Sequence, residues 1–464
     1  MIDVSVSWLA SATKGKLVHI GSQKIVNNIS TDSRTIKEGD CFIALKGQNF
    51  DGHNFIKECI DKKVKVFIVN SLFFRNNQNI FKGDISVITV KDTYQALTNL
   101  ALNYRTDFIF DKKIIAITGS SGKTTTKFLI AQLLSYKYNV EFSPKSFNNN
   151  IGVPLSLFKI NNDTEIGVIE VGMNHKGEIR KLSKIISPDV GIITNIGFAH
   201  IEFLKTTRNI ALAKSELFEG MKEGNVVFIN KLTRHLDVIE NNAKKHNLII
   251  RYFDPSKAKV ITNKGIDGIV FEYDGVNFET NVPGVHNIEN LVCALEVCKS
   301  FEIDIKDLVP IIRKLNLPEM RSNIIKGKFT IIDDSYNANP DSMKKAIDLL
   351  ESTTSNGKKI AVLGDMLELG EMSNNLHLEI AKYLLDKNID YIICYGEKFA
   401  LVYDFLLQNG KPKDKVISTN SITETAEILN YIVKEGDTIL IKASRGMRLN
   451  EISSFLENKL KEVV

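Results

Sequence analysis

A glycine-rich segment in the first third of the chain constrains the fold more than any other feature. Residues 119–126 read Gly-Ser-Ser-Gly-Lys-Thr-Thr-Thr. A short β-branched run at residues 114–117 precedes this segment, and an apolar-periodic stretch at residues 128–134 follows it. Runs of these two kinds predict a strand and a helix. The order of strand, glycine turn and helix predicts a phosphate site, because glycines let backbone N–H groups approach an anion at a helix N-terminus.

The predicted phosphate-binding turn comprises Gly119, Ser120, Ser121, Gly122, Lys123, Thr124 and Thr125. We expect Lys123 to contact the β- and γ-phosphates of ATP and the Thr124 hydroxyl to bind Mg²⁺. The usual P-loop has a glycine where this chain has Ile117, so the shorter pattern GxxGKTT fits instead. A glycine turn with a solvated lysine is the alternative interpretation.

Two changes of pattern, near residues 110 and 323, divide the 464-residue chain. After the second change, compact apolar runs alternate with longer amphipathic stretches such as residues 342–351 and 376–385. The apolar runs lie at residues 329–332, 360–363, 391–395 and 438–442. Buried strands that alternate with helices predict a parallel sheet covered on both faces. We therefore expect an α/β protein with three domains, at residues 1–110, 111–323 and 324–464.

The composition excludes several classes of protein. Hydrophobic residues make up 43% of the chain and charged residues 25%, as in ordinary globular proteins. No stretch approaches the roughly 18 apolar residues of a membrane span, and the N-terminus does not resemble a signal peptide, so we expect a cytoplasmic protein without membrane insertion. The five cysteines form no CxxC pair, which favours reduced structural thiols. The 60 basic and 55 acidic residues form no basic block, so nucleic acid is not an expected partner.

Further segments, spread over nearly the whole chain, resemble the Mur ligase family. Near the N-terminus they are residues 31–34, 39–47 and 51–53, and in the centre they are residues 146–154, 194–200, 213–216 and 286–290. The resemblance implies an N-terminal UDP-sugar-binding domain, a central P-loop-type ATPase domain and a C-terminal Rossmann-like domain that holds an incoming amine. It also implies an ATP-dependent amide ligase.

Two C-terminal segments narrow this resemblance. Residues 333–343 and 361–371 are similar to the family member that adds D-alanyl-D-alanine to UDP-N-acetylmuramoyl-tripeptide, a step of peptidoglycan synthesis. The Asn-Pro-Arg signature of the diaminopimelate-adding relative is absent from the expected position. Two methionines depart from the family pattern: Met320 stands where glycine is expected before Arg321, and Met173 replaces a small residue.

The resemblance assigns the expected catalytic residues, Lys123, His200 and Lys214. Glu170 follows an apolar run and would bind Mg²⁺, although a surface glutamate at a strand end is the alternative. His200 would bind a second Mg²⁺, whereas a lone histidine is more often an ordinary polar residue. Lys214 would carry a carbamate, although its segment alone suggests a helix with a solvated lysine.

Other polar residues complete the expected site. Asn287 and Asn290 suit an adenine edge, with helix capping by Asn287 as the alternative. Arg321 would bind phosphate and Asp334 would bind ribose, which completes the ATP site. The residues expected to bind the UDP-peptide and the amine are Ser33, Arg34, Lys46, Asn149, Asn150, Tyr336, Asn337, Lys442, Ser444 and Arg445.

The reaction implied by the family has two steps. A carboxylate of the UDP-linked peptide attacks the γ-phosphorus of ATP to give an acyl phosphate, and the amine then displaces phosphate. We expect a monomeric enzyme. The alternatives are a diaminopimelate-adding or folate polyglutamate-type ligase, a P-loop phosphotransferase, and a nucleotide-regulated binding protein without catalysis. The joint presence of the Mg²⁺-binding and catalytic candidates argues against the last of these.

Overall fold

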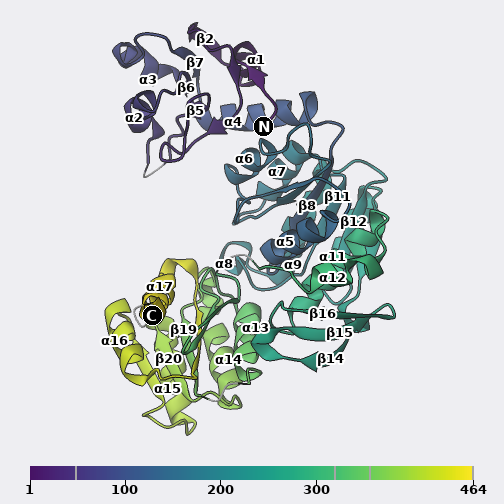
Figure 1. Cartoon of the computed structure of the whole chain (residues 1–464), viewed down its shortest axis with the longest axis vertical. Helices are drawn as coiled ribbons and strands as arrows, with labels where there is room; N and C mark the ends of the chain where they lie inside the picture. The colour runs from purple at the N-terminus through teal and green to yellow at the C-terminus, as the bar shows by residue number, and fades with distance from the viewer. Residues whose placement is uncertain (48–49, 318–319, 355–356, 462–464) are drawn as a thin grey trace.

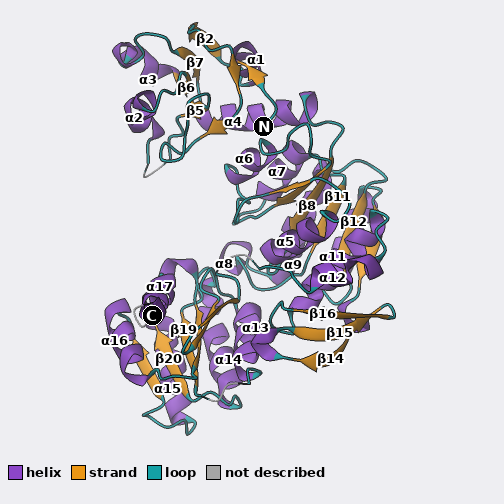
Figure 2. Cartoon of the chain, in the orientation of Figure 1, coloured by secondary structure: helices purple, strands orange, loops and turns teal. Residues whose placement is uncertain are grey.

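The computed structural model describes residues 1–47, 50–317, 320–354 and 357–461. The chain forms three successive lobes that together make a C-shaped molecule, with the N-terminal and C-terminal lobes at its two ends (Figure 1). Each lobe has a sheet with helices packed against it (Figure 2). Across the described ranges, no helix combines the length and the apolarity that crossing a membrane requires.

The N-terminal lobe is built on a sheet whose strands follow the order β2-β7-β6-β5-β4. These strands are β2 (Lys16–His19), β4 (Ile29–Ser30), β5 (Cys41–Ile43), β6 (Val66–Asn70) and β7 (Ser86–Val90). The long helix α4 (Thr93–Asp107) joins this lobe to the next. The hydroxyl of Tyr104 donates to the carbonyl of Ile160 at 2.7 Å, and Arg105 Nε donates to the carbonyl of Ile186 at 2.9 Å. These buried bonds anchor α4 to the central lobe.

The central lobe contains a parallel sheet in the order β13-β12-β11-β8-β10-β9. Its strands are β8 (Lys113–Thr118), β9 (Val140–Phe142), β10 (Ile166–Glu170), β11 (Val190–Ile193), β12 (Val226–Asn230) and β13 (Ile249–Phe253). Strand β8 and helix α5 (Lys123–Leu134) confirm the predicted strand, turn and helix. A glycine is required at Gly119, because its φ is +155° and a Cβ there would collide with the side chain of Thr194.

An antiparallel sheet of β14 (Lys259–Asn263), β15 (Ile269–Tyr273) and β16 (Val276–Thr280) extends the central lobe. The sequence patterns did not predict it. A signal was present, because Asp274-Gly275 between two strand-like runs is typical of a tight hairpin. Both residues have positive φ, at +48° and +76°.

The C-terminal sheet follows the order β17-β18-β22-β19-β20-β21. Its strands are β17 (Asn323–Lys326), β18 (Thr330–Asp333), β19 (Lys359–Gly364), β20 (Tyr391–Tyr395), β21 (Val416–Thr419) and β22 (Thr438–Lys442). The four predicted strands are confirmed and lie parallel to one another. The edge strand β17 is antiparallel, because a short turn at residues 327–329 connects it directly to β18. The sheet is therefore mixed at this edge rather than entirely parallel.

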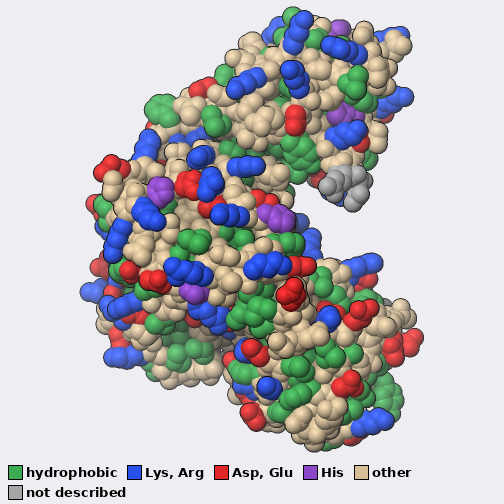
Figure 3. Space-filling view, turned by 180° about the vertical axis from the view of Figure 1, so that it is seen from behind, with side chains coloured by type: hydrophobic (Ala, Val, Ile, Leu, Met, Phe, Trp, Pro, Cys, Tyr) green, Lys and Arg blue, Asp and Glu red, His purple; other side chains and the backbone are tan. Residues whose placement is uncertain are grey.

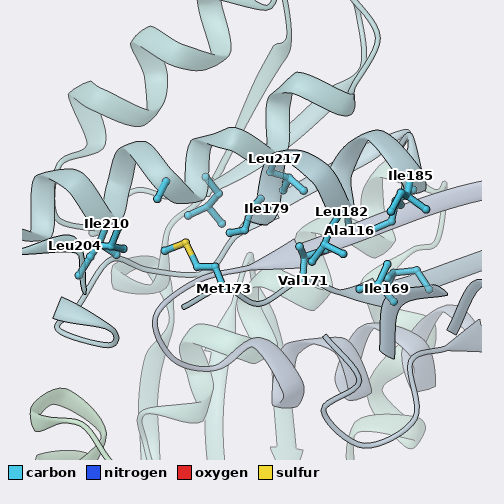
Figure 4. Close-up of a cluster of buried hydrophobic side chains, with 14 of the residues drawn as sticks. Ala116, Ile169, Val171, Met173, Ile179, Leu182, Ile185, Leu204, Ile210 and Leu217 are labelled. Carbon is cyan, nitrogen blue, oxygen red and sulfur yellow. The ribbon is translucent and has the colours of Figure 1, made fainter. Parts of the chain in front are cut away.

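The departure at Met173 has a packing explanation. Its side chain is buried in an apolar cluster beside α7 (Glu178–Ile186) and α9 (Thr207–Ser215) (Figure 4). Ile179 and Ile210 belong to the same cluster. Burial of a methionine side chain contributes about 1.5–3 kcal/mol, so the larger residue here stabilises the central lobe.

Candidate active site

A cavity of about 1140 Å³ takes its walls from all three lobes. A notch separates the two outer lobes and is visible from behind (Figure 3). The predicted site residues that line the cavity are Ser120, Ser121, Gly122, Lys123, Thr125, Asn149, Asn150, Glu170, His200, Asn287, Asn290, Arg321, Asp334, Tyr336, Asn337, Lys442, Ser444 and Arg445. Residues far apart in the sequence thus meet in one cavity.

Two lysines meet behind the phosphate-binding turn. Lys123 Nζ and Lys214 Nζ each donate to the carbonyl of Gly119, both at 2.8 Å. Lys214 is only 1% exposed, so the interpretation of this residue as a solvated lysine is wrong. Burial lowers the pKa of Lys214 well below its ordinary value, and the positive charge of Lys123 lowers it further. Lys214 is therefore disposed to be a neutral amine.

A neighbouring segment holds the turn in place. Ser121 N–H donates to the side-chain oxygen of Asn195 at 2.9 Å, and Ser120 N–H donates to its carbonyl at the same distance. The Thr194 hydroxyl donates to the carbonyl of Ser121 at 2.6 Å. These bonds fix the backbone of the turn where it lines the cavity. Neither Thr194 nor Asn195 was among the predicted site residues, although both lie in a family-like segment.

Glu170 ends β10 inside the protein and is 0% exposed, so the surface-glutamate alternative is wrong. Asn148 Nδ2 donates to its Oε1 at 2.8 Å, and Lys127 Nζ lies 3.4 Å from its Oε2. Burial alone would raise the pKa of Glu170, but nearby positive charges, that of Lys127 foremost, hold it below the ordinary value. Burial also lowers the pKa of Lys127, to about 8. Neither Asn148 nor Lys127 was a predicted site residue.

The oxygen donors around Glu170 suit Mg²⁺. The Thr124 hydroxyl is buried beside the cavity, 3.4 Å from the hydroxyl of Ser146. In the part of the chain that the structure describes, no group of three or more His, Cys, Asp or Glu side chains is arranged to hold a metal ion. Mg²⁺ commonly binds through one or two carboxylates together with substrate phosphates and water. This donor set therefore fits an ion that the nucleotide helps to hold.

His200 faces a carboxylate from the C-terminal lobe. Its Nδ1 lies 2.6 Å from Oε2 of Glu368, and this contact with His200 lowers the pKa of the Glu368 carboxyl. Burial lowers the pKa of His200. The backbone N–H of Glu202 also donates to the carbonyl of Glu368 at 3.1 Å. The sequence placed Glu368 in a family-like segment but predicted no role for it.

The adenine candidates form a buried chain of amides. Asn287 is the first residue of α11 (Asn287–Ser300), and its Nδ2 donates to the carbonyl of Pro283 at 2.8 Å. Asn290 Nδ2 donates to Oδ1 of Asn287 at 2.8 Å. The cap position of α11 belongs to His286, so the capping alternative for Asn287 is wrong.

The junction of the central and C-terminal lobes orders several predicted residues. Asp334 pairs with Lys442 at 2.5 Å and accepts a bond from the N–H of Ser322 at 3.1 Å. The guanidinium carbons of Arg321 and Arg445 lie 4.1 and 5.2 Å from the ring centre of Tyr336. This stacking orients both arginines beside the cavity.

The backbone conformation of Met320 explains why the family pattern has glycine before Arg321. Its φ is +55°, in the left-handed region. Glycine adopts this region without the steric cost that a side chain incurs. The chain therefore keeps the turn of the junction despite an unfavourable residue.

The three predicted residues of the N-terminal lobe lie elsewhere. Arg34 pairs with Asp32 at 2.7 Å, and its side chain is 83% exposed. Lys46, with a side chain 70% exposed, lies 3.7 Å from Asp51, and Ser33 is buried. None of the three is among the described residues that line the cavity. The N-terminal lobe reaches it instead through the start of α4, at Asp92, Tyr94, Gln95, Thr98 and Leu102.

Comparison with protein families gives three matches. Residues 25–105 match "Mur ligase family, catalytic domain", residues 117–298 match "Mur ligase middle domain", and residues 320–445 match "Mur ligase, glutamate ligase domain". The UDP-N-acetylmuramoyl-tripeptide–D-alanyl-D-alanine ligase of Bacillus subtilis is 36% identical, with 97% of this chain and 98% of that protein covered.

Solved structures agree with these matches. MurF from Acinetobacter baumannii has a TM-score of 0.84 and 28% identity, with 98% of this chain and 99% of that chain covered. MurF ligase from Thermotoga maritima in complex with ADP has a TM-score of 0.76 and 26% identity, with 94% of this chain and 98% of that chain covered. The similarity thus includes all three lobes.

Proposed function

Because the chain belongs to the Mur ligase family, we propose that it is the ATP-dependent ligase that adds D-alanyl-D-alanine to UDP-N-acetylmuramoyl-tripeptide. The product is the UDP-N-acetylmuramoyl-pentapeptide precursor of peptidoglycan. The main support for this proposal is that a relative named for this reaction aligns with 97% of the chain. The cavity supports it, because a phosphate-binding turn and the dipeptide-type C-terminal segments line the same space.

In the first step, a carboxylate oxygen of the tripeptide attacks the γ-phosphorus of ATP, and the bond to the ADP oxygen breaks. Lys123 turns from the Gly119 carbonyl to the phosphates and offsets their negative charge. Mg²⁺, when bound, would be held by Thr124 and Glu170, with a second ion at His200, and supplies positive charge to the phosphates. Asn287, Asn290 and the stacked Arg321 hold the nucleotide.

In the second step, the neutral amine of D-alanyl-D-alanine attacks the acyl carbon, and inorganic phosphate leaves. The amine proton must pass to a base or to water. The segments around Tyr336 and Glu368 approach the cavity from the C-terminal lobe and suit the incoming dipeptide. Contact between the lobes excludes water, which would otherwise hydrolyse the acyl phosphate.

We also propose that Lys214 is carbamylated in the active enzyme. Carbon dioxide adds only to a neutral amine, and the buried position of Lys214 favours that form. The product is a carbamate anion and a proton, so a neutral amine beside Lys123 becomes an anion. That anion can help to hold the second metal ion near His200. A high-resolution density map of the nucleotide-bound enzyme tests this, and a bare amine there would contradict it.

The remaining parts of the proposal concern the whole chain. Ser33, Arg34 and Lys46 bind the UDP end of the substrate, and Asn149 and Asn150 bind its peptide. The domains divide at residues 110/111 and 323/324. We propose that the enzyme is a monomer and that it acts in the cytoplasm, where ATP is available.

A substrate panel tests the proposed function. We expect purified enzyme to release phosphate from ATP when UDP-N-acetylmuramoyl-tripeptide and D-alanyl-D-alanine are both present. Faster release with the UDP-dipeptide and diaminopimelate or lysine would make it a different ligase of the same family. Phosphate transfer to a stable product without an amine would indicate a phosphotransferase, and no turnover with any pair would indicate a binding protein.

A further inference from the structure

A second lysine on helix α5 lies at the proposed metal site. Lys127 follows Lys123 by four residues, one helical turn, and is 0% exposed. Its Nζ donates to the backbone carbonyl of Lys145 and to Oε2 of Glu170, the latter at 3.4 Å. A buried ammonium is costly unless it is paired and hydrogen-bonded. The charge of Lys127 is therefore tied to the Glu170 carboxylate.

Other groups fix Glu170 as well, but they are neutral. Asn148 Nδ2 donates to Oε1 at 2.8 Å, and the backbone N–H of Glu170 donates to the Ser143 hydroxyl at 3.0 Å. The Asn148 bond orients the side chain, the Ser143 bond fixes the backbone, and neither neutralises the charge. Among the described residues, Lys127 is the cation that forms an ion pair with this carboxylate, at 3.4 Å, whereas the charges of Lys123 and Arg321 act on it from farther away.

We propose that Lys127 is a positioning residue that serves as the resident counter-ion of Glu170. While the nucleotide site is empty, it balances the buried carboxylate and keeps its affinity for a divalent cation low. When ATP binds, phosphate oxygens supply further ligands and negative charge, and the ion binds to Glu170 together with the nucleotide. The proposal rests on the metal-binding role of Glu170 in the proposed function.

Direct metal binding to the nucleotide-free full-length protein tests this. Free Mn²⁺ is measured by electron paramagnetic resonance during titration of wild type and Lys127→Gln, which removes the charge but keeps a hydrogen-bond donor. We expect the variant to bind Mn²⁺ roughly tenfold more tightly than wild type, because an opposing charge has been removed. Unchanged or weaker binding in a folded variant would overturn the proposal. A merely structural role for Lys127 predicts no gain in affinity.

Two further variants separate the possible causes. Lys145→Gln removes a positive charge from an exposed side chain of the same loop and leaves the carbonyl that Lys127 uses, so its Mn²⁺ affinity should match wild type. A gain there equal to that of Lys127→Gln would show a non-specific charge effect and overturn the proposal. When it is combined with Glu170→Gln, the nucleotide-free Lys127→Gln variant should lose its gain in Mn²⁺ affinity. If it does not, the metal site itself is misassigned.

The wild-type protein provides a test that does not depend on the folding of Lys127→Gln. Circular dichroism shows whether each variant is folded. If the glutamine variant is not, nucleotide-free wild type should still bind Mn²⁺ only weakly, and Lys127→Arg, which retains the charge, should bind it no more tightly. Tight Mn²⁺ binding by nucleotide-free wild type would overturn the proposal without any variant.

Discussion

The junction of the central and C-terminal lobes differs from the N-terminal lobe in how its charged side chains are paired. At the junction, charged groups meet across the lobes: Arg234 lies 3.1 Å from Asp341, and Lys345 lies 2.8 Å from Glu289. In the N-terminal lobe, Arg34 pairs with its own neighbour Asp32 on the surface. Most residues predicted to serve the reaction thus line one cavity, whereas those predicted to bind UDP do not.

The difference follows from what each end must do. Acyl transfer needs groups fixed before the substrate arrives, since misplaced groups lose much of their catalytic effect. A surface ion pair contributes only about 0–1 kcal/mol, so Arg34 can exchange Asp32 for a ligand at little cost. We infer that the protein organises the reaction centre and that the substrate organises the UDP end.

The largest effect is expected at the phosphate-binding turn. Lys123→Ala should leave a folded protein whose ligase turnover falls roughly a hundredfold or more, because a charge contact to the transferring phosphoryl group is lost. Phosphate release measures turnover, and the affinity for the UDP-tripeptide should change little. Near-normal turnover in the purified variant would show that the turn does not take part in the reaction. It would also contradict the difference inferred between the two ends of the site.

The next effect concerns Lys214, behind the same turn. Lys214→Arg keeps a positive charge but cannot form a carbamate, so the variant should be inactive. Lys214→Ala should also be inactive, but small carboxylic acids should partly restore its turnover by supplying the missing anion. Activity in the arginine variant would show that no carbamate is needed. Rescue of Lys123→Ala by the same acids would show that the rescue is not specific to this position.

A smaller effect is expected where the C-terminal lobe meets His200. Glu368→Ala removes the carboxylate that lies 2.6 Å from His200 Nδ1 but leaves the backbone bond from Glu202. Because the group is partly exposed, the loss should be about 1 kcal/mol, or roughly a fivefold rise in KM for D-alanyl-D-alanine. The KM for the UDP-tripeptide serves as the internal control. A rise in that value alone would show that this loop serves the other substrate.

The sequence predicts the parts of the site that follow from local order along the chain. The run at residues 114–117, the glycine turn and Lys123 are adjacent, so strand, turn and helix bring them together as expected. Glu170 likewise lies at the end of a predicted buried strand. Even the place of Lys127 had a local signal, because residues four apart on a helix share a face.

Other features depend on contacts that the sequence does not encode locally. Asn148 reaches Glu170, and Glu368 reaches His200, only through tertiary packing. The motif of the N-terminal lobe indicates a type of ligand, but it does not indicate how this lobe is oriented against the central lobe. That orientation depends on where α4, the helix that joins the two lobes, begins and ends. A motif thus identifies chemistry, while distances between lobes come from the fold.

The smallest effect is expected at Arg34, and it tests the UDP end directly. Arg34→Gln removes a cation that is exposed and already paired with Asp32, so only a small loss of binding is expected. This corresponds to a two- to fivefold rise in KM for the UDP-tripeptide, with kcat and the KM for ATP unchanged.

Lys65→Gln is the matched control, because Lys65 is a half-exposed cation of the same lobe that pairs with Asp84 and was not a predicted substrate residue. Equal effects of the two variants would reduce the Arg34 result to general electrostatic attraction of an anionic substrate. A fall in kcat for Arg34→Gln would show that binding at the UDP end affects catalysis at the reaction centre, so that the two ends are coupled rather than independent.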